Sequence, residues 1–169
     1  MTRGRGVGLL LVAALVAGCL FDPKQFEKVE YTPKGPSAQD LYLQRMYEAN
    51  GRAPTFDERR RFEAEMEDRV YAYLRAHPEL EQTPRYMEFR FWWQVGRGNT
   101  PEEVRVLLDE PQEQTADPAR MAALAERQWP QIQGKAKEAW VYQPGWVIYF
   151  DDTSVVGMVR RVSSLDASN

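Results

Sequence analysis

The stretch Trp140-Val141-Tyr142-Gln143-Pro144-Gly145-Trp146-Val147-Ile148-Tyr149-Phe150 predicts a β-hairpin near the end of the chain. Pro144 and Gly145 occupy the two central positions that specify a type II turn. After the turn, side chains alternate, with Trp146, Ile148 and Phe150 on one face and Val147 and Tyr149 on the other. A polar turn at 151–154 and a strand over 155–162 follow. We therefore expect a three-stranded antiparallel sheet, one face of which helices must cover.

Two helices are predicted before this sheet. Thr100-Pro101-Glu102-Glu103 combines an N-cap threonine, a proline at the first helical position and a glutamate that completes a capping box. That helix ends at Pro111, and a second begins at Asp117-Pro118, carries Met121, Leu124 and Ala125, and finishes near 129–130, before a loop over 131–138. The candidate core is Val104, Leu107, Leu108, Trp140, Tyr142, Ile148 and Phe150.

Residues 37–95 are predicted to form a helical extension. Ser37-x-x-Asp40 starts one helix and Asn50-Gly51 stops it. Thr55-x-x-Glu58 caps a longer helix that ends at His77-Pro78. Its apolar positions recur at three- and four-residue steps and form one stripe, whereas the rest is a charged, solvated face; the stripe is Phe62, Met66, Val70, Tyr73 and Leu74.

Residues 84–95 fit two patterns. The proline start and the Gly96 stop favour a helix, although a period of two places Met87, Phe89, Phe91, Trp93 and Val95 on one face. The segment is too apolar to be covered on one side only. Either it is buried between the helices and the rest, or it presents a patch for a partner. The candidate patch residues are Tyr86, Phe89, Trp92 and Trp93.

The first residues predict export. Arg3 and Arg5 precede an apolar run over 7–16 that is too short to span a bilayer, and small residues follow, as in a secretory signal peptide. Leu15-Val16-Ala17-Gly18-Cys19 resembles a bacterial lipobox, which implies cleavage after residue 18, a diacylglycerol thioether on Cys19 and an acylated amine. The alternative is an ordinary signal peptide that leaves a free thiol. Residues 19–36, which contain Pro23, Pro33 and Pro36, then form an extended tether.

Residues 96–169 resemble a known family. The pattern begins with Gly98-x-Thr100-x-x-Glu103-Val104-x-x-Leu107-Leu108-x-x-Pro111 and continues with Trp140-x-Tyr142, Ile148-x-Phe150 and Val155-Val156. It is similar to the pattern of the SmpA/OmlA (BamE-like) outer-membrane lipoproteins. The resemblance implies two helices packed on a three-stranded antiparallel sheet and a role near the β-barrel assembly machinery. Asn99 and Asp109 stand where the family has methionine and glycine, and Thr153-Ser154 lacks the hairpin glycine.

Composition excludes several functions. A net charge of −3 argues against nucleic acid as a partner, and one cysteine allows neither an intrachain disulfide nor a cysteine-based metal site. The only histidine, His77, lies at a helix end, where it caps carbonyl groups. Glu102/Glu103 and Asp151/Asp152 suit a helix N-terminus and a turn, although the second pair would also fit a weak divalent-ion site. We therefore expect no enzymatic activity, no cofactor beyond the covalent lipid, and no metal.

The sequence thus predicts a lipid-anchored protein on the periplasmic face of the bacterial outer membrane, because Leu20 rather than an acidic residue follows Cys19. Retention at the inner membrane is the alternative location. The expected role is a non-enzymatic scaffold or assembly module with an envelope protein as partner, including the barrel-assembly components. The alternative is a periplasmic binding or inhibitory module, similar to β-lactamase inhibitors, that acts on another protein.

Overall fold

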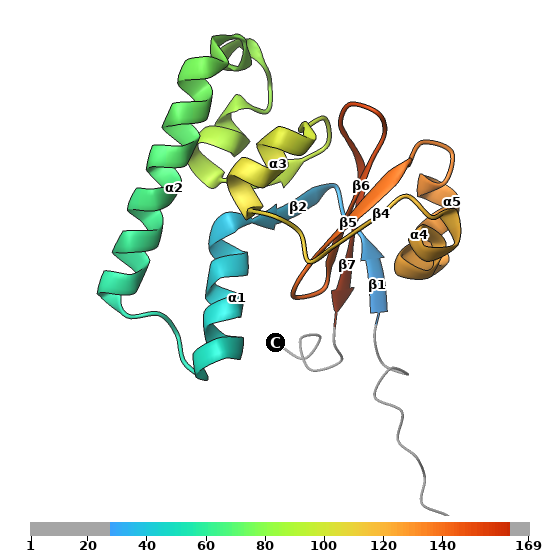
Figure 1. The fold of residues 1–169 in the computed structure, drawn as a ribbon, viewed down its shortest axis with the longest axis horizontal. Coiled ribbons are helices and arrows are strands. Elements are labelled where there is room, and N and C mark those ends of the chain that lie inside the picture. Colours follow the sequence, from blue (N-terminus) through green and yellow to red (C-terminus); the bar gives the residue numbers. More distant parts are fainter. Residues whose placement is uncertain (1–27, 163–169) are drawn as a thin grey trace, which may run out of the picture.

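The computed structural model describes residues 28–162, which form an α+β fold around a five-stranded antiparallel sheet (Figure 1). The strand order is β1 (Lys28–Tyr31), β7 (Val155–Val162), β6 (Trp146–Phe150), β5 (Glu138–Tyr142) and β4 (Glu113–Thr115). A second, two-stranded sheet pairs β2 (Lys34–Ser37) with β3 (Gln94–Gly96). The α-helices are α1 (Ala38–Asn50), α2 (Phe56–Ala76), α3 (Pro101–Leu108), α4 (Pro118–Ala125) and α5 (Trp129–Ile132).

The prediction of a three-stranded sheet is wrong. The expected meander is present as β5, β6 and β7, and the paired residues Trp140 and Ile148 lie in register on β5 and β6. Two further strands extend it at both edges. On one edge β1 pairs with β7 from Lys28↔Val162 to Tyr31↔Val159, and on the other β4 pairs with β5. The residues from Lys28 onward, which the sequence assigned to a tether, therefore belong to the folded body.

The N-terminal helical extension is also not matched as predicted. Helices α1 and α2 lie within residues 37–95, but β1 and β2 precede them and β3 follows them. Backbone N–H of Ala38, at the start of α1, donates to the carbonyl oxygen of Trp93 at 2.9 Å, next to β3. Because β2 and β3 pair across this whole segment, the helices are closed into the same body as the sheet rather than appended to it.

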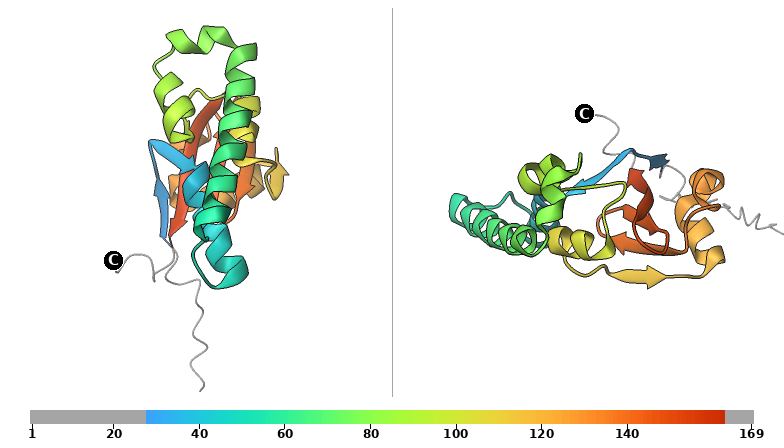
Figure 2. Two further views of the ribbon diagram at one scale, coloured as in Figure 1. Left: turned by 90° about the vertical axis from the view of Figure 1, so that its left-hand side faces the viewer. Right: turned by 90° about the horizontal axis from the view of Figure 1, so that it is seen from above.

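Helices cover both faces of the sheet, not one as predicted (Figure 2). One face carries Trp140, Ile148 and Phe150 toward α1, α2 and α3. The opposite face carries Val141, Val147 and Tyr149 toward α4 and α5. All five residues of the central strand β6 are buried as a result, although they alternate between faces as the sequence predicts. The helices predicted at 100–111 and from 117 onward consequently lie on opposite sides of the sheet.

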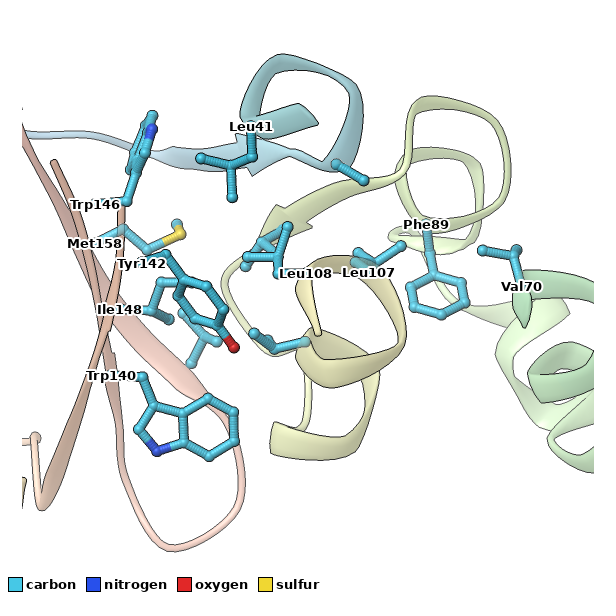
Figure 3. Close-up of a cluster of buried hydrophobic side chains, with 14 of the residues drawn as sticks. Leu41, Val70, Phe89, Leu107, Leu108, Trp140, Tyr142, Trp146, Ile148 and Met158 are labelled. Carbon is cyan, nitrogen blue, oxygen red and sulfur yellow. The ribbon is translucent and has the colours of Figure 1, made fainter. Parts of the chain in front are cut away.

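The first core is the one that the sequence predicted. It contains all seven candidate core residues, and Figure 3 shows the Trp140, Tyr142 and Ile148 side chains extending from the sheet toward Leu107 and Leu108 of α3. On the far side of α3, Phe89 and Val70 continue the same cluster. Burial of apolar surface contributes roughly 25 cal/mol per Å². The packing of α3 between the sheet and α2 therefore holds these three elements together.

The helix ends confirm the sequence signals. The Ser37 side chain accepts from the backbone N–H of Asp40, and both Thr55 and Thr100 form complete capping boxes with Glu58 and Glu103. Gly51 closes α1 in the left-handed region at φ 66°, where glycine is favoured. The loop before β6 places Gly145 at the positive φ, 73°, that the sequence predicts. The predicted type II turn is otherwise not matched, because the Gln143–Pro144 peptide is cis and residues 143–145 lie between the paired Tyr142 and Trp146.

Candidate functional site

The four predicted partner-patch residues divide into a buried part and an exposed part. Phe89 is buried with 2% of its surface exposed, whereas Trp92 is 68% exposed. Tyr86 and Trp93 are half-buried and pack against the core. The prediction that these four residues form one exposed patch is therefore wrong for Phe89, and Trp92 alone of the four is fully on the surface.

Further exposed apolar side chains come from the same segment as Trp92 and from the helix α2 packed beside it. Met87 and Phe91 are 55% and 56% exposed in the same short segment, and Tyr71 of α2 is 46% exposed. We call Tyr71, Met87, Arg90, Phe91 and Trp92 the aromatic surface. Large apolar side chains that cluster in the open mark interaction sites more often than isolated ones do.

A single cation joins the two elements of the aromatic surface. The Arg90 guanidinium lies 3.8 Å from the centroid of the Tyr71 ring and 4.9 Å from that of Phe91. It also donates a hydrogen bond to the Tyr71 hydroxyl. The Phe91 ring meets Tyr86 edge-on at 6.5 Å. Arginine flanked by aromatic rings is a composition enriched at protein interfaces.

The backbone that presents this surface has an unusual shape. Residues Glu88–Trp92 form η3, a single π-helical turn that follows a 3-10 turn, η2 (Pro78–Gln82), and Trp93 ends it in the left-handed region at φ 46°. A bulky residue there costs of order 1–3 kcal/mol, and π-turns occur frequently at functional sites.

Buried side chains hold the turn in place from below. The Phe89 ring packs 5.4 Å from the ring of Tyr73 on α2, and burial raises the pKa of the Tyr73 phenol, which keeps it neutral. The Trp93 ring meets Phe62 edge-on at 6.2 Å. At the rim, Lys34 of β2 pairs with Glu88 at 3.7 Å. The aromatic surface thus rests on a fixed base rather than on a free loop.

A buried polar network fixes the chain just before this turn. Arg85 donates to the Gly98 carbonyl at 2.6 Å and to Glu103 at 3.0 Å, and the Glu103 side chain is 2% exposed. Asn99 donates to Glu103 at 2.6 Å and accepts from the Gly96 N–H. The Glu103 carboxylate also accepts from the Thr100 backbone N–H, so its hydrogen bonds all hold neighbouring segments of the chain in place. This network ties the turn to the start of α3.

The other residues considered for chemistry take structural roles. His77 caps α2 and lies 3.1 Å from Glu79. Asp151 accepts from the backbone N–H groups of Thr153 and Ser154, which lowers its pKa, and Asp152 pairs with Lys137 at 2.5 Å. Among residues 28–162 no cluster of metal-ligating side chains occurs, and no helix in this range is long and apolar enough to cross a membrane. Cys19 lies outside the described residues.

Sequence reasoning missed Tyr71 and Arg90. Tyr71 falls on the helix face that was assigned to solvent, and Arg90 was not singled out. One signal could have found Tyr71, which is a large aromatic on the charged side of α2, away from the stripe of Met66, Val70 and Leu74. Comparison of the chain with protein-family models, with curated proteins and with solved structures found no match. The resemblance to the SmpA/OmlA lipoproteins therefore stays a prediction.

Proposed function

We propose that this protein is a non-enzymatic lipoprotein of the bacterial envelope that docks a partner protein through its aromatic surface. Acyl chains on Cys19 would hold it on the periplasmic face of the outer membrane. Each buried CH₂ contributes roughly 0.8 kcal/mol, so two or more chains give stable attachment without a spanning helix. The resemblance to SmpA/OmlA lipoproteins supports barrel-assembly components as the partner class.

The aromatic surface is the observation that carries this proposal. Met87, Phe91 and Trp92 are each more than half exposed, although the turn below them is held by buried Phe89. Exposing three such side chains on an ordered base forgoes apolar burial that the same residues would gain in an interface. Aromatic side chains with an adjacent arginine are also the residue types that dominate binding energy at interfaces.

The position of the anchor suits a partner on the far side of the protein. Cys19 precedes Lys28 by nine residues, a length that spans at most about 30 Å. The greatest possible distance between the membrane and the folded body is therefore shorter than for a tether that extends to residue 36. In Figure 1, β1 begins at the lower side of the body, whereas η3 and the second half of α2 lie at the upper left. The aromatic surface would then face the periplasm.

Site-specific photo-crosslinking in the native host tests the proposal. A photoreactive residue replaces Trp92, and the control replaces Tyr47, which is 55% exposed on α1 and lies outside the aromatic surface. We expect a discrete crosslinked partner from position 92, no such product from position 47, and loss of the product when Phe91 is changed to Ala. A barrel-assembly component supports the scaffold role, whereas a periplasmic enzyme supports the inhibitory module instead. Equal products from both positions, or none, would contradict a docking role for this surface.

A further inference from the structure

A groove between α1, α2 and α3 has no role in the function proposed above. It encloses about 420 Å³, within the range of small-molecule sites. Its walls are side chains of α1 and α2, which meet where the Tyr42 and Phe62 rings stack at 4.1 Å. The end of α3 closes it with Leu107, Leu108 and Asp109.

The floor of the groove is apolar. Leu41, Leu107 and Leu108 line it and are each at least 98% buried, and Phe62 adds a half-buried ring. These leucines belong to the main core, so the floor is rigid. The apolar surface that the groove still exposes belongs to Tyr42, Met46 and Phe62, which line it and are half-buried, so a ligand that covers these three side chains gains apolar burial.

Two guanidinium groups border this floor with unsatisfied hydrogen-bond donors. Arg45 donates through Nε to the Gln143 carbonyl at 3.4 Å, while its Nη2 is buried and has no partner. Arg69 is paired with Asp109, while its Nε is buried without a partner. A buried donor on a charged group is costly to leave unbonded. Both side chains line the groove and are only partly buried, so their guanidinium groups are open to an anionic acceptor there.

The acidic side chains around the groove are largely engaged. Glu58 accepts two hydrogen bonds from Arg52, at 2.8 and 2.9 Å, and the pKa of Glu58 is held at about 2 mainly by that arginine. Asp109 is engaged by Arg69, and Glu65 lies exposed at the rim. Arg45 and Arg61 therefore outnumber the remaining carboxylate, and the local field favours a bound anion.

We propose that this groove binds a straight-chain amphiphilic carboxylate of the fatty-acid type. The carboxylate would accept from Arg45, and the hydrocarbon chain would lie over Tyr42, Met46 and Phe62. A peptide fits less well, because the walls are mostly helix interiors whose backbone groups are already bonded, so its own N–H and C=O groups would be buried without partners. The proposal is independent of the aromatic surface and of the partner that docks there.

Calorimetric titration tests it with decanoate, and with decanol as the uncharged match, both below their micelle thresholds. The full chain carrying Cys19→Ala is used, since it cannot bear a competing acyl group at that position. We expect one decanoate per chain and about tenfold weaker binding of decanol. Arg45→Gln should weaken decanoate binding by about tenfold and leave decanol unchanged. Arg75→Gln, the same charge change at the end of α2 away from the groove, should alter neither.

Several results would overturn the proposal. The proposal fails if decanoate does not bind, or if decanol binds with equal affinity. It also fails if Arg45→Gln binds decanoate as tightly as Arg75→Gln does, or if an acidic peptide binds more tightly than decanoate. A dimer in sedimentation that dissociates on Phe62→Glu would show a second copy of the chain in the groove and would also overturn it. If Arg45→Gln does not fold, as judged by its melting curve, the comparison of decanoate with decanol on the parent chain decides the matter.

Discussion

Replacing Asp109 by glycine should give a more stable protein than replacing it by alanine, the reverse of the usual order for these residues. Asp109 ends α3 at φ 64° and ψ −161°, a region that is almost restricted to glycine. Its backbone N–H bonds to the Arg105 carbonyl at 2.9 Å, and its own carbonyl accepts from the Tyr142 hydroxyl at 3.0 Å. These contacts fix the strained conformation in place.

The magnitude follows from comparing the two variants. Both variants lose the ion pair between Arg69 and Asp109, whose side chains are 37% and 63% exposed, respectively. Such an exposed pair contributes about 0–1 kcal/mol, and its loss cancels in the comparison. Glycine relieves about 1–3 kcal/mol of backbone strain that alanine retains. Its greater freedom in the unfolded chain costs about 0.4–1 kcal/mol. From the middle of each range, glycine should exceed alanine by about 1.3 kcal/mol.

Urea unfolding at neutral pH, followed by tryptophan fluorescence, measures the difference, with both variants in the Cys19→Ala chain. The slopes of the two transitions should agree, so that the midpoints alone report stability. In thermal melts the same difference corresponds to about 3–4 °C. An alanine variant that is as stable as the glycine variant, or more so, would refute the assigned backbone conformation at residue 109.

Three further outcomes are expected. Trp140→Ala should lower the free energy of unfolding by about 3–5 kcal/mol, because the ring is 1% exposed and packs 4.5 Å from Phe150; an unchanged urea midpoint would contradict its burial. Glu58→Gln should destabilise the protein at pH 7, because Arg52 lowers the pKa of Glu58 to about 2 and the ionised carboxylate stabilises the fold. This stabilisation is lost as the pH falls toward that value, so the difference in unfolding free energy between parent and variant should shrink in acid. A difference that stays constant with pH would argue against the ion pair. Cys19→Ala should leave the protein out of the membrane fraction, and normal retention on fractionation would argue against the anchor.

The sequence predicted those elements whose signal is local. The capping boxes at Thr55 and Thr100 satisfy backbone groups within one turn, so their pattern alone sets where α2 and α3 begin. The strands at 146–150 and 155–162 were predicted with the bounds that the structure shows, because their apolar residues lie between clear turn signals. The seven candidate core residues are all buried, as their apolar periodicity along these helices and strands predicts.

The missing strands have no comparable local signal. Strand β4 (Glu113–Thr115) is a polar edge strand that exists through its pairing with β5, and β1 follows a proline-containing segment that reads as a tether. Residues 84–95 contain both predicted structures, with a helical turn up to Trp92 and a strand from Gln94, and the left-handed Trp93 joins them. Packing against Phe62 determines that junction, and periodicity carries no information about it.

The candidate site was predictable in part. The apolar excess of 84–95 pointed to the correct segment, but which side faces solvent depends on how Phe89 fits against α2. Tyr71 and Arg90 come together only through the tertiary fold, because nineteen residues separate them. The π-turn has no signature in the sequence, and the contribution of α2 to the aromatic surface is indicated only by an aromatic residue, Tyr71, on its charged side.

Mass spectrometry of the intact protein from its native host tests the central claim most directly, since anchoring at Cys19 decides where every other feature acts. The account predicts a chain that begins at Cys19 and carries the mass of a diacylglycerol thioether with an acylated amine. A chain that retains residues 1–18, or one with an unmodified thiol at Cys19, would contradict it.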